Sequence, residues 1–336
     1  MKYYFAPMEG VTKYPFRRVH HSFFPGIDAY YMPFIVANQT MHFKQKELRD
    51  IAPENNAGIP VVPQVLTNKP DQFLHAVQML AGLGYREINF NLGCPMATVV
   101  SKNKGAGFLA VPEELDRFFE AVFDGLEAKV SANRISSQNT LRISVKTRIG
   151  VENASESVRL MEIFNRYPIA RLIIHARRRV DFYKEDLDLD TFGEMLAAST
   201  HPVIYNGDLI TADDLIRLQE RFPAVDSVMI GRGLIRNPAL VREMKGGAPF
   251  TRRELEQYLD ALFESYSEAF CEGNNVVRKM KELWFYLEEY FPENKKQLKR
   301  IKKAKTAAEY RTAVKELFCS CAAVGDSGSL DDSKKK

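Results

Sequence analysis

Eight short apolar runs, separated by helical patterns, are the feature that most limits what this chain can fold into. Several runs lack a clean alternation of apolar and polar residues, as parallel strands covered on both faces do. Between them, Pro112 opens one helical pattern, and Thr211 before Asp213 and Asp214 indicates the N-terminal cap of another. The runs are residues 3–6, 28–32, 61–66, 87–91, 142–147, 171–175, 203–206 and 226–230.

Eight strands alternating with helices over about 240 residues predict an α/β fold, a (β/α)₈ TIM barrel. A doubly wound open sheet is the alternative, but no glycine-rich dinucleotide fingerprint follows the first run. After Pro249 only helical patterns remain, so we expect a smaller all-helical domain. The predicted domains are a barrel over residues 1–246, a helical domain over 247–322 and a disordered tail over 323–336, which is polar.

Composition narrows the class of protein further. Of 336 residues, 45% are hydrophobic and 27% charged, values ordinary for a soluble enzyme. No apolar run could span a bilayer and no signal peptide is apparent, so we expect a cytoplasmic protein. We also expect it to be monomeric. The four scattered cysteines suggest neither a disulfide framework nor, with Cys319 and Cys321 lacking a second ligand pair, a metal site.

The stretch Asn89 to Pro95 closes the fourth run and presents a thiol. Gly93 frees the backbone, and Pro95 holds Cys94 extended just past a strand end, where barrel enzymes carry their chemistry. The following residues 101–107 are polar and basic without a core pattern, which suggests a mobile cover. Cys94 could instead be a small buried hydrophobe, as most free cysteines are.

Other polar residues also follow strand ends. Loops after strands seven and eight of such barrels commonly hold a phosphate, and here they carry Asn206-Gly207-Asp208 and Gly231-Arg232-Gly233. A cofactor anchored there would extend towards Lys146 and Gln64, whose carboxamide could pair with a flavin edge. Taken singly, each residue has an ordinary structural explanation. Their coincidence on consecutive strand ends favours a flavin site.

These motifs resemble those of the tRNA-dihydrouridine synthase family, in order and spacing. The segments that carry the resemblance are residues 6–12, 89–95, 145–150, 202–208 and 228–233. The resemblance implies FMN, bound without a covalent link and reduced by NADPH. It further implies hydride transfer from flavin N5 to C6 of a tRNA uracil, with Cys94 giving the proton to C5.

The resemblance also implies roles for other residues. Asn91 and Arg148 would orient the uracil, and Arg278 and Lys281, one turn apart, would contact tRNA. The implied cofactor-binding residues are Pro7, Met8, Glu9, Gln64, Lys146, His175, Asn206, Gly207, Asp208, Gly231 and Arg232. After His175, Arg177 matches the family pattern, but the chain then departs from it with two further arginines, Arg178 and Arg179, which either contact the RNA backbone or are solvated.

The ordinary pKa of a cysteine thiol and the distribution of charge along the chain both support the function that the resemblance implies. A thiol near its free pKa of about 8.5 stays protonated at neutral pH and can donate, whereas a nucleophilic cysteine would need a nearby histidine or other cation. Residues 291–315 contain nine Lys or Arg and two Asp or Glu, a local positive surface suited to phosphates or a solvated helix face.

Two other functions remain open from the sequence. One is a flavin barrel oxidoreductase acting on a small molecule, such as a dihydroorotate-type dehydrogenase, which leaves the basic helical region without a purpose. The other is a catalytically silent RNA-binding protein, against which the intact Cys94, Asn91 and Lys146 argue.

Overall fold

The structure, a computed structural model, describes residues 1–38, 40, 42–131, 141–270 and 273–322. The predicted disordered tail, residues 323–336, lies outside the described residues. The chain divides into two compact units. The first comprises Met1–Gly10, Asp28–Asp208 and Arg217–Ile230, and the second Val11–Ile27, Leu209–Ile216 and Gly231–Lys336. The boundary expected after residue 246 stays a prediction.

The first unit is built on one wholly parallel sheet of ten strands. The strands are β1 (Lys2–Phe5), β2 (Ala29–Tyr31), β3 (Ile35–Val36), β4 (Val61–Val62), β5 (Gln64–Leu66), β6 (Glu87–Leu92), β7 (Arg142–Arg148), β8 (Leu172–His175), β9 (Val203–Asn206) and β10 (Ser227–Ile230). All eight predicted runs contain a strand, and only β3 was missed.

Two prolines explain why ten strands make an eight-membered ring. Pro33 separates β2 from β3, and Pro63 separates β4 from β5, because proline cannot donate to a strand ladder. β2 pairs with β4 and β3 with β5, so each pair of short strands is one interrupted strand. Since β10 pairs with β1, the ring closes, and the predicted (β/α)₈ barrel is confirmed.

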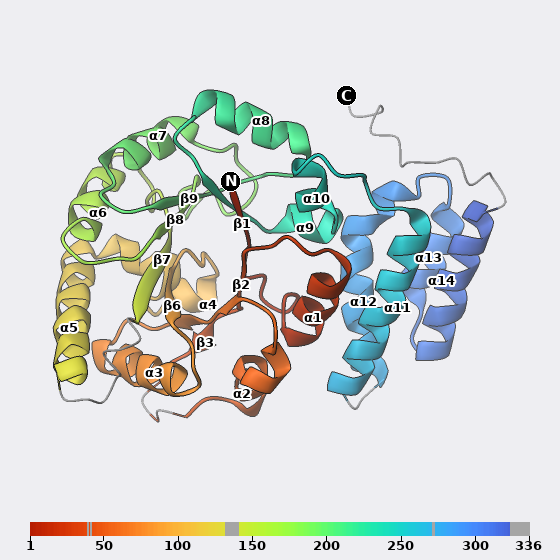
Figure 1. Cartoon of the computed structure of the whole chain (residues 1–336), viewed down its shortest axis with the longest axis horizontal. Coiled ribbons are helices and arrows are strands. Elements are labelled where there is room, and N and C mark those ends of the chain that lie inside the picture. Colours follow the sequence, from red (N-terminus) through yellow and green to blue (C-terminus); the bar gives the residue numbers. More distant parts are fainter. Residues whose placement is uncertain (39, 41, 132–140, 271–272, 323–336) are drawn as a thin grey trace. The chain divides into compact units, whose positions relative to one another are not determined.

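Helices cover the outer side of this sheet (Figure 1). They include α2 (Gln45–Ile51), α3 (Pro70–Gly82), α5 (Pro112–Ser131), α6 (Glu156–Phe164) and α7 (Leu189–Ala198). The 3-10 helix η1 (Pro53–Asn56) follows α2, and α4 (Ala97–Val100) and the 3-10 helix η2 (Gly105–Ala110) lie between β6 and α5. Pro112 begins α5 as predicted. Helix α8 (Ala212–Arg221) begins at the predicted cap, where the Thr211 hydroxyl accepts the Asp214 N–H at 3.2 Å.

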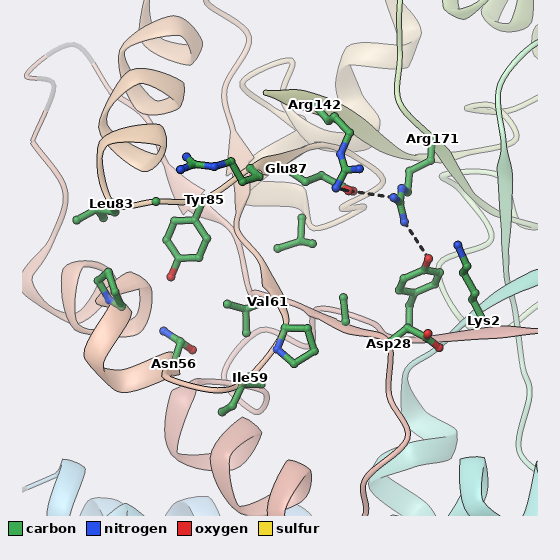
Figure 2. Close-up of a pocket in the computed structure, with 17 residues that line it drawn as sticks. Lys2, Asp28, Asn56, Ile59, Val61, Leu83, Tyr85, Glu87, Arg142 and Arg171 are labelled. Carbon is green, nitrogen blue, oxygen red and sulfur yellow. Dashed lines mark hydrogen bonds and ion pairs between the residues drawn. The ribbon is translucent and has the colours of Figure 1, made fainter. Parts of the chain in front are cut away.

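The N-terminal ends of the strands surround a cavity of about 580 Å³ (Figure 2). There the buried carboxylate of Glu87 accepts from the Tyr31 hydroxyl at 3.0 Å and lies 3.3 Å from the Arg171 guanidinium. Arg171 in turn donates to the Tyr4 hydroxyl at 2.8 Å. None of the predicted site residues lines this cavity. Polar groups at this end of a barrel serve stability, and the opposite end carries the chemistry.

The second unit is helical among its described residues. Its helices are α1 (Tyr14–Phe23), α9 (Arg232–Arg236), α10 (Leu240–Met244), α11 (Arg252–Ala269), α12 (Gly273–Leu287), η3 (Glu288–Tyr290), α13 (Lys295–Lys303) and α14 (Ala307–Ala322). Helix α1 packs against α11, although it lies in the chain between β1 and β2. Helix α12 packs against α11, α13 and α14, with Trp284 buried and donating to the Tyr310 hydroxyl at 2.8 Å.

Among the described residues, none of the helices has the length and apolar character needed to cross a membrane. The same residues contain no group of three or more His, Cys, Asp or Glu side chains that could hold a metal ion.

Candidate active site

Cys94 lies just beyond the C-terminal end of β6, half-buried, and Asn91 holds it there. The Asn91 side-chain oxygen Oδ1 accepts the backbone N–H of Gly93 at 3.2 Å and that of Cys94 at 3.0 Å. This is a turn in which an asparagine side chain replaces backbone hydrogen bonds. Pro95 follows and cannot continue the strand ladder, so the chain leaves the sheet at the thiol.

A buried chain of hydrogen bonds extends from Asn91 across three strands. Asn91 Nδ2 donates to Gln64 Oε1 at 2.6 Å, Gln64 Nε2 to Asn89 Oδ1 at 2.6 Å, and Asn89 Nδ2 to Ser144 Oγ at 3.0 Å. Sheet register explains the contacts, because Gln64 and Ser144 are the neighbours of Asn89 on β5 and β7. Asn89 and Asn91 share one face of β6, being two residues apart.

All donors in this chain point the same way, from the Cys94 N–H through three carboxamides to Ser144. Hydrogen bonds aligned in this manner polarise one another in a low-dielectric interior. The carboxamides of Gln64 and Asn91, both expected to face ligands, are therefore already engaged with the protein. Each retains a second N–H for a further contact.

The segment expected to be a mobile cover without a core pattern, residues 101–107, is exposed at 101–103 but packed at its end, which corrects the expectation for residues 105–107. Gly105, Ala106 and Gly107 are buried. Gly105 has φ +55°, and a Cβ at that position would lie 2.8 Å from the Cys94 carbonyl oxygen. The Ala106 N–H donates to the same oxygen at 3.0 Å. Only glycine permits this close approach, and the segment thus fixes the backbone of Cys94 from the other side.

Arg148, at the end of β7, is fully buried and binds three backbone carbonyls. Nε donates to Gly93 at 2.9 Å, Nη1 to Arg178 at 2.8 Å and Nη2 to Phe182 at 2.8 Å. Its guanidinium also lies over the Tyr183 ring, 5.2 Å from the centroid. Arg148 was expected to orient a uracil. Its contacts join the Cys94 turn to the loop after β8.

Lys146 is the neighbour of Asn91 in the β6–β7 ladder and is half-buried. Its Nζ makes no hydrogen bond or ion pair with the residues that the structure describes. The pKa of Lys146 is lowered from 10.5 to about 7, chiefly by desolvation and to a smaller extent by the nearby charge of Arg148. An unpaired, desolvated amine of this kind favours the binding of an anion, because a nearby negative charge would stabilise the protonated amine and raise its pKa towards the ordinary value.

Burial raises the pKa of the Cys94 thiol above its usual range. Arg148 and Lys146 act in the opposite direction, and exposed Glu9 adds to the rise. The thiol is therefore protonated at neutral pH, as an acid must be. Pro7 and Met8, which precede Glu9 in the loop after β1, are half-buried.

The ends of β8 and β9 carry His175 and Asn206, two of the residues expected at the cofactor site. Asn206 Nδ2 donates to the Met229 carbonyl at 2.8 Å, and His175 stacks on Tyr183 with centroids 5.9 Å apart. Position 207 requires glycine, because a Cβ atom there would collide with the Tyr205 ring.

Arg177, which matches the family pattern after His175, was not assigned to the site from the sequence. It is 3% exposed, and it donates to the Glu185 carbonyl at 2.6 Å and to the Asp208 carboxylate at 2.5 Å. Its Nη1 is buried without a partner among the described residues. The next two arginines form ion pairs within the protein, Arg178 with Asp181 at 2.9 Å and Arg179 with Glu152 at 3.4 Å.

Four predicted residues belong to the second unit. Gly231 and Arg232 follow β10 at the start of α9. Arg278 is exposed on α12, whereas Lys281 is half-buried and donates from Nζ to the carbonyl of Ala304, at the end of α13, at 3.0 Å.

Comparisons with known proteins agree with the motifs. The family model described as dihydrouridine synthase (Dus) matches residues 4–322. The tRNA-dihydrouridine synthase B of Pasteurella multocida is 27% identical over 244 residues, which cover 72% of this chain and 68% of that protein. The tRNA-dihydrouridine(16) synthase of Cupriavidus necator is 28% identical over 305 residues, covering 86% and 89%.

Two solved structures share the fold at low sequence identity. Morphinone reductase is 13% identical with a TM-score of 0.51, covering 74% of this chain and 86% of that chain. An old yellow enzyme homologue from Zymomonas mobilis is 11% identical with a TM-score of 0.50, covering 74% and 90%.

Proposed function

The chain belongs to the dihydrouridine synthase family and forms 5,6-dihydrouridine in tRNA, and from that premise we propose which residues carry the reaction. The family resemblance predicted from the motifs is confirmed. Reduction of the uracil C5–C6 double bond needs a hydride at C6 and a proton at C5. We infer that Cys94 donates that proton through its thiol.

One observation carries this assignment. A half-buried thiol with a pKa raised by burial stands at the C-terminal end of a barrel strand, on a turn that Asn91 holds. A general acid needs both a bound proton and a fixed position. Asn91 and Arg148 would orient the uracil through the N–H groups that their contacts leave free, while holding the Cys94 backbone.

We propose FMN, bound without a covalent link, as the cofactor. When bound and reduced by NADPH, it supplies the hydride. Lys146 favours an anionic ligand here, because its Nζ has no partner among the described residues. The charge of Arg177 is paired with Asp208, but its buried Nη1 has no partner among those residues and could donate to a ligand. The residues proposed to hold it are Pro7, Met8, Glu9, Gln64, Lys146, His175, Asn206, Gly207, Asp208, Gly231 and Arg232, with Arg177 added.

We propose that the helical domain, residues 247–322, binds tRNA through Arg278 and Lys281. A uracil stacked inside folded RNA must be extruded to reach a barrel mouth, and that requires a grip on the surrounding RNA. We also propose that the protein acts as a cytoplasmic monomer.

The test is a single-turnover assay on the purified protein. We expect a yellow protein that releases FMN on heating, is reduced by NADPH, and is reoxidised by an unmodified tRNA transcript with formation of dihydrouridine. The matched control is a transcript with cytidine replacing the modified uridine, which should bind but leave the flavin reduced. A protein that takes up only FAD, or a reduced flavin that tRNA leaves unchanged, would contradict the proposal.

A further inference from the structure

Phe285 is the most exposed of the large hydrophobic side chains described, at 72%. It lies on α12, whose inward face already fills the helical core with Met280, Leu283, Trp284 and Leu287. Phe285 therefore contributes little to packing. The Tyr286 ring stands nearly perpendicular to it, with centroids 5.6 Å apart. This contact limits the orientations of the Phe285 ring, while most of its surface stays in solvent.

A single exposed phenylalanine is common on protein surfaces and does not by itself mark a binding site. The charged side chains around Phe285 indicate what it could bind. Arg278 lies seven residues before Phe285, and Lys281 four before it, so the three side chains lie along one stripe of α12. We call Arg278, Lys281 and Phe285 the α12 stripe. Arg278 is exposed and makes no ion pair with any described residue.

The positive charge continues beyond α12. Lys281 Nζ contacts the carbonyl of Ala304 at 3.0 Å, which places the α12 stripe beside the end of α13. Lys303 and Lys305 flank Ala304 and are both exposed. The carboxylates within one turn of Phe285 are each paired with another cation, Glu282 with Lys279, Glu288 with Lys302 and Glu289 with Arg236. An aromatic ring beside Arg278 and Lys281, which make no ion pair with a described residue, fits a polyanion better than an apolar protein surface.

We propose that an unpaired base of tRNA stacks on Phe285 while the cations of the α12 stripe bind the neighbouring phosphates. This inference rests on the proposed function and deepens it, by naming the contact through which the helical domain meets a base. Stacking on an aromatic side chain is how proteins usually hold single-stranded bases of RNA. Every base has a π face, so the contact requires no particular nucleotide.

The experiment measures the affinity of the FMN-loaded protein for an unmodified tRNA transcript at several salt concentrations. Phe285→Ala should weaken binding about 5- to 150-fold, the range for one stacked base, and leave the slope of log K against log salt unchanged. Arg278→Ala should instead make that slope about one unit shallower. Phe285→Trp should retain affinity, whereas Phe285→Leu, apolar without a π face, should lose it.

The matched control is Val158→Ala, which shortens another exposed apolar side chain, 61% exposed, on α6 of the barrel unit. FMN content and thermal midpoint establish that each variant is folded. Unchanged affinity in Phe285→Ala, or parental affinity in Phe285→Leu, would overturn the stacking contact. Failure of the proposed function would give a different result, because the parent protein itself would then form no dihydrouridine in tRNA.

Discussion

The side-chain oxygen of Asn91 accepts the backbone N–H of Cys94 at 3.0 Å, and the same side chain donates to Gln64 at 2.6 Å. Asn91 thus joins the thiol-bearing turn to a buried chain of carboxamides inside the barrel. Rigid strands on both sides of β6 thereby control the position of a residue in a loop. Sites supported in this way are held more accurately than sites that depend on loop packing alone.

Cys94→Ala should retain FMN and tRNA binding but lose dihydrouridine formation, because only the proton for C5 is missing. Cys94→Ser should show slow residual turnover, since a hydroxyl donates far less readily. In the parent, the single-turnover rate should hold through neutral pH and fall only above the raised thiol pKa. A nucleophilic cysteine would show a rate that increases with pH, and parental turnover in Cys94→Ala would make Cys94 a structural residue.

Asn89→Ala should lower both stability and turnover although Asn89 touches no proposed ligand. The substitution leaves the buried Gln64 Nε2 and Ser144 Oγ without this partner, a cost of about 1–3 kcal/mol. Denaturant midpoints and single-turnover rates with tRNA would measure the two effects. Ser144→Ala is the control, because it removes only the terminal acceptor and should perturb turnover less. Equal effects of the two variants would argue against a directional chain.

Arg148→Lys separates the two roles open to this residue. A lysine keeps the charge but cannot bind three carbonyls in the geometry of a guanidinium. We expect faster amide hydrogen exchange around residues 93–94 and 178–182 in the absence of tRNA, together with at least tenfold slower turnover. If Arg148 acted only on uracil, exchange in the tRNA-free variant would match the parent.

Lys146→Met tests the lowered amine pKa through stability. The folded pKa of about 7 lies below the 10.5 of the unfolded chain, so between these values the unfolded state binds more protons. The stability of the cofactor-free parent should therefore gain from this group as pH rises above about 7. The difference in thermal midpoint between parent and Lys146→Met measures that gain. A difference that does not change from pH 7 to 9 would show that Lys146 titrates normally.

Local residue patterns were enough to predict the barrel and the position of its reactive thiol. Short apolar runs ending in Asn91, His175 or Asn206 mark strands and strand ends, because parallel burial and chain direction follow from neighbouring residues. Thr211 and Pro112 likewise mark helix starts through local hydrogen bonding and φ. The break at Pro33 was also visible in the sequence, although the two-residue strand after it was too short to recognise.

By itself, then, the sequence determined the fold class, the reactive residue types and the strand ends that carry them, because these depend on chemistry within a few residues. Only the tertiary structure decided which partners those groups have. Ser144 receives the carboxamide chain through cross-strand register, and Arg148 binds Gly93 across 55 residues of chain. The tertiary structure also grouped α1 with the helices of the second unit. Such pairings depend on how distant segments pack, which no local pattern encodes.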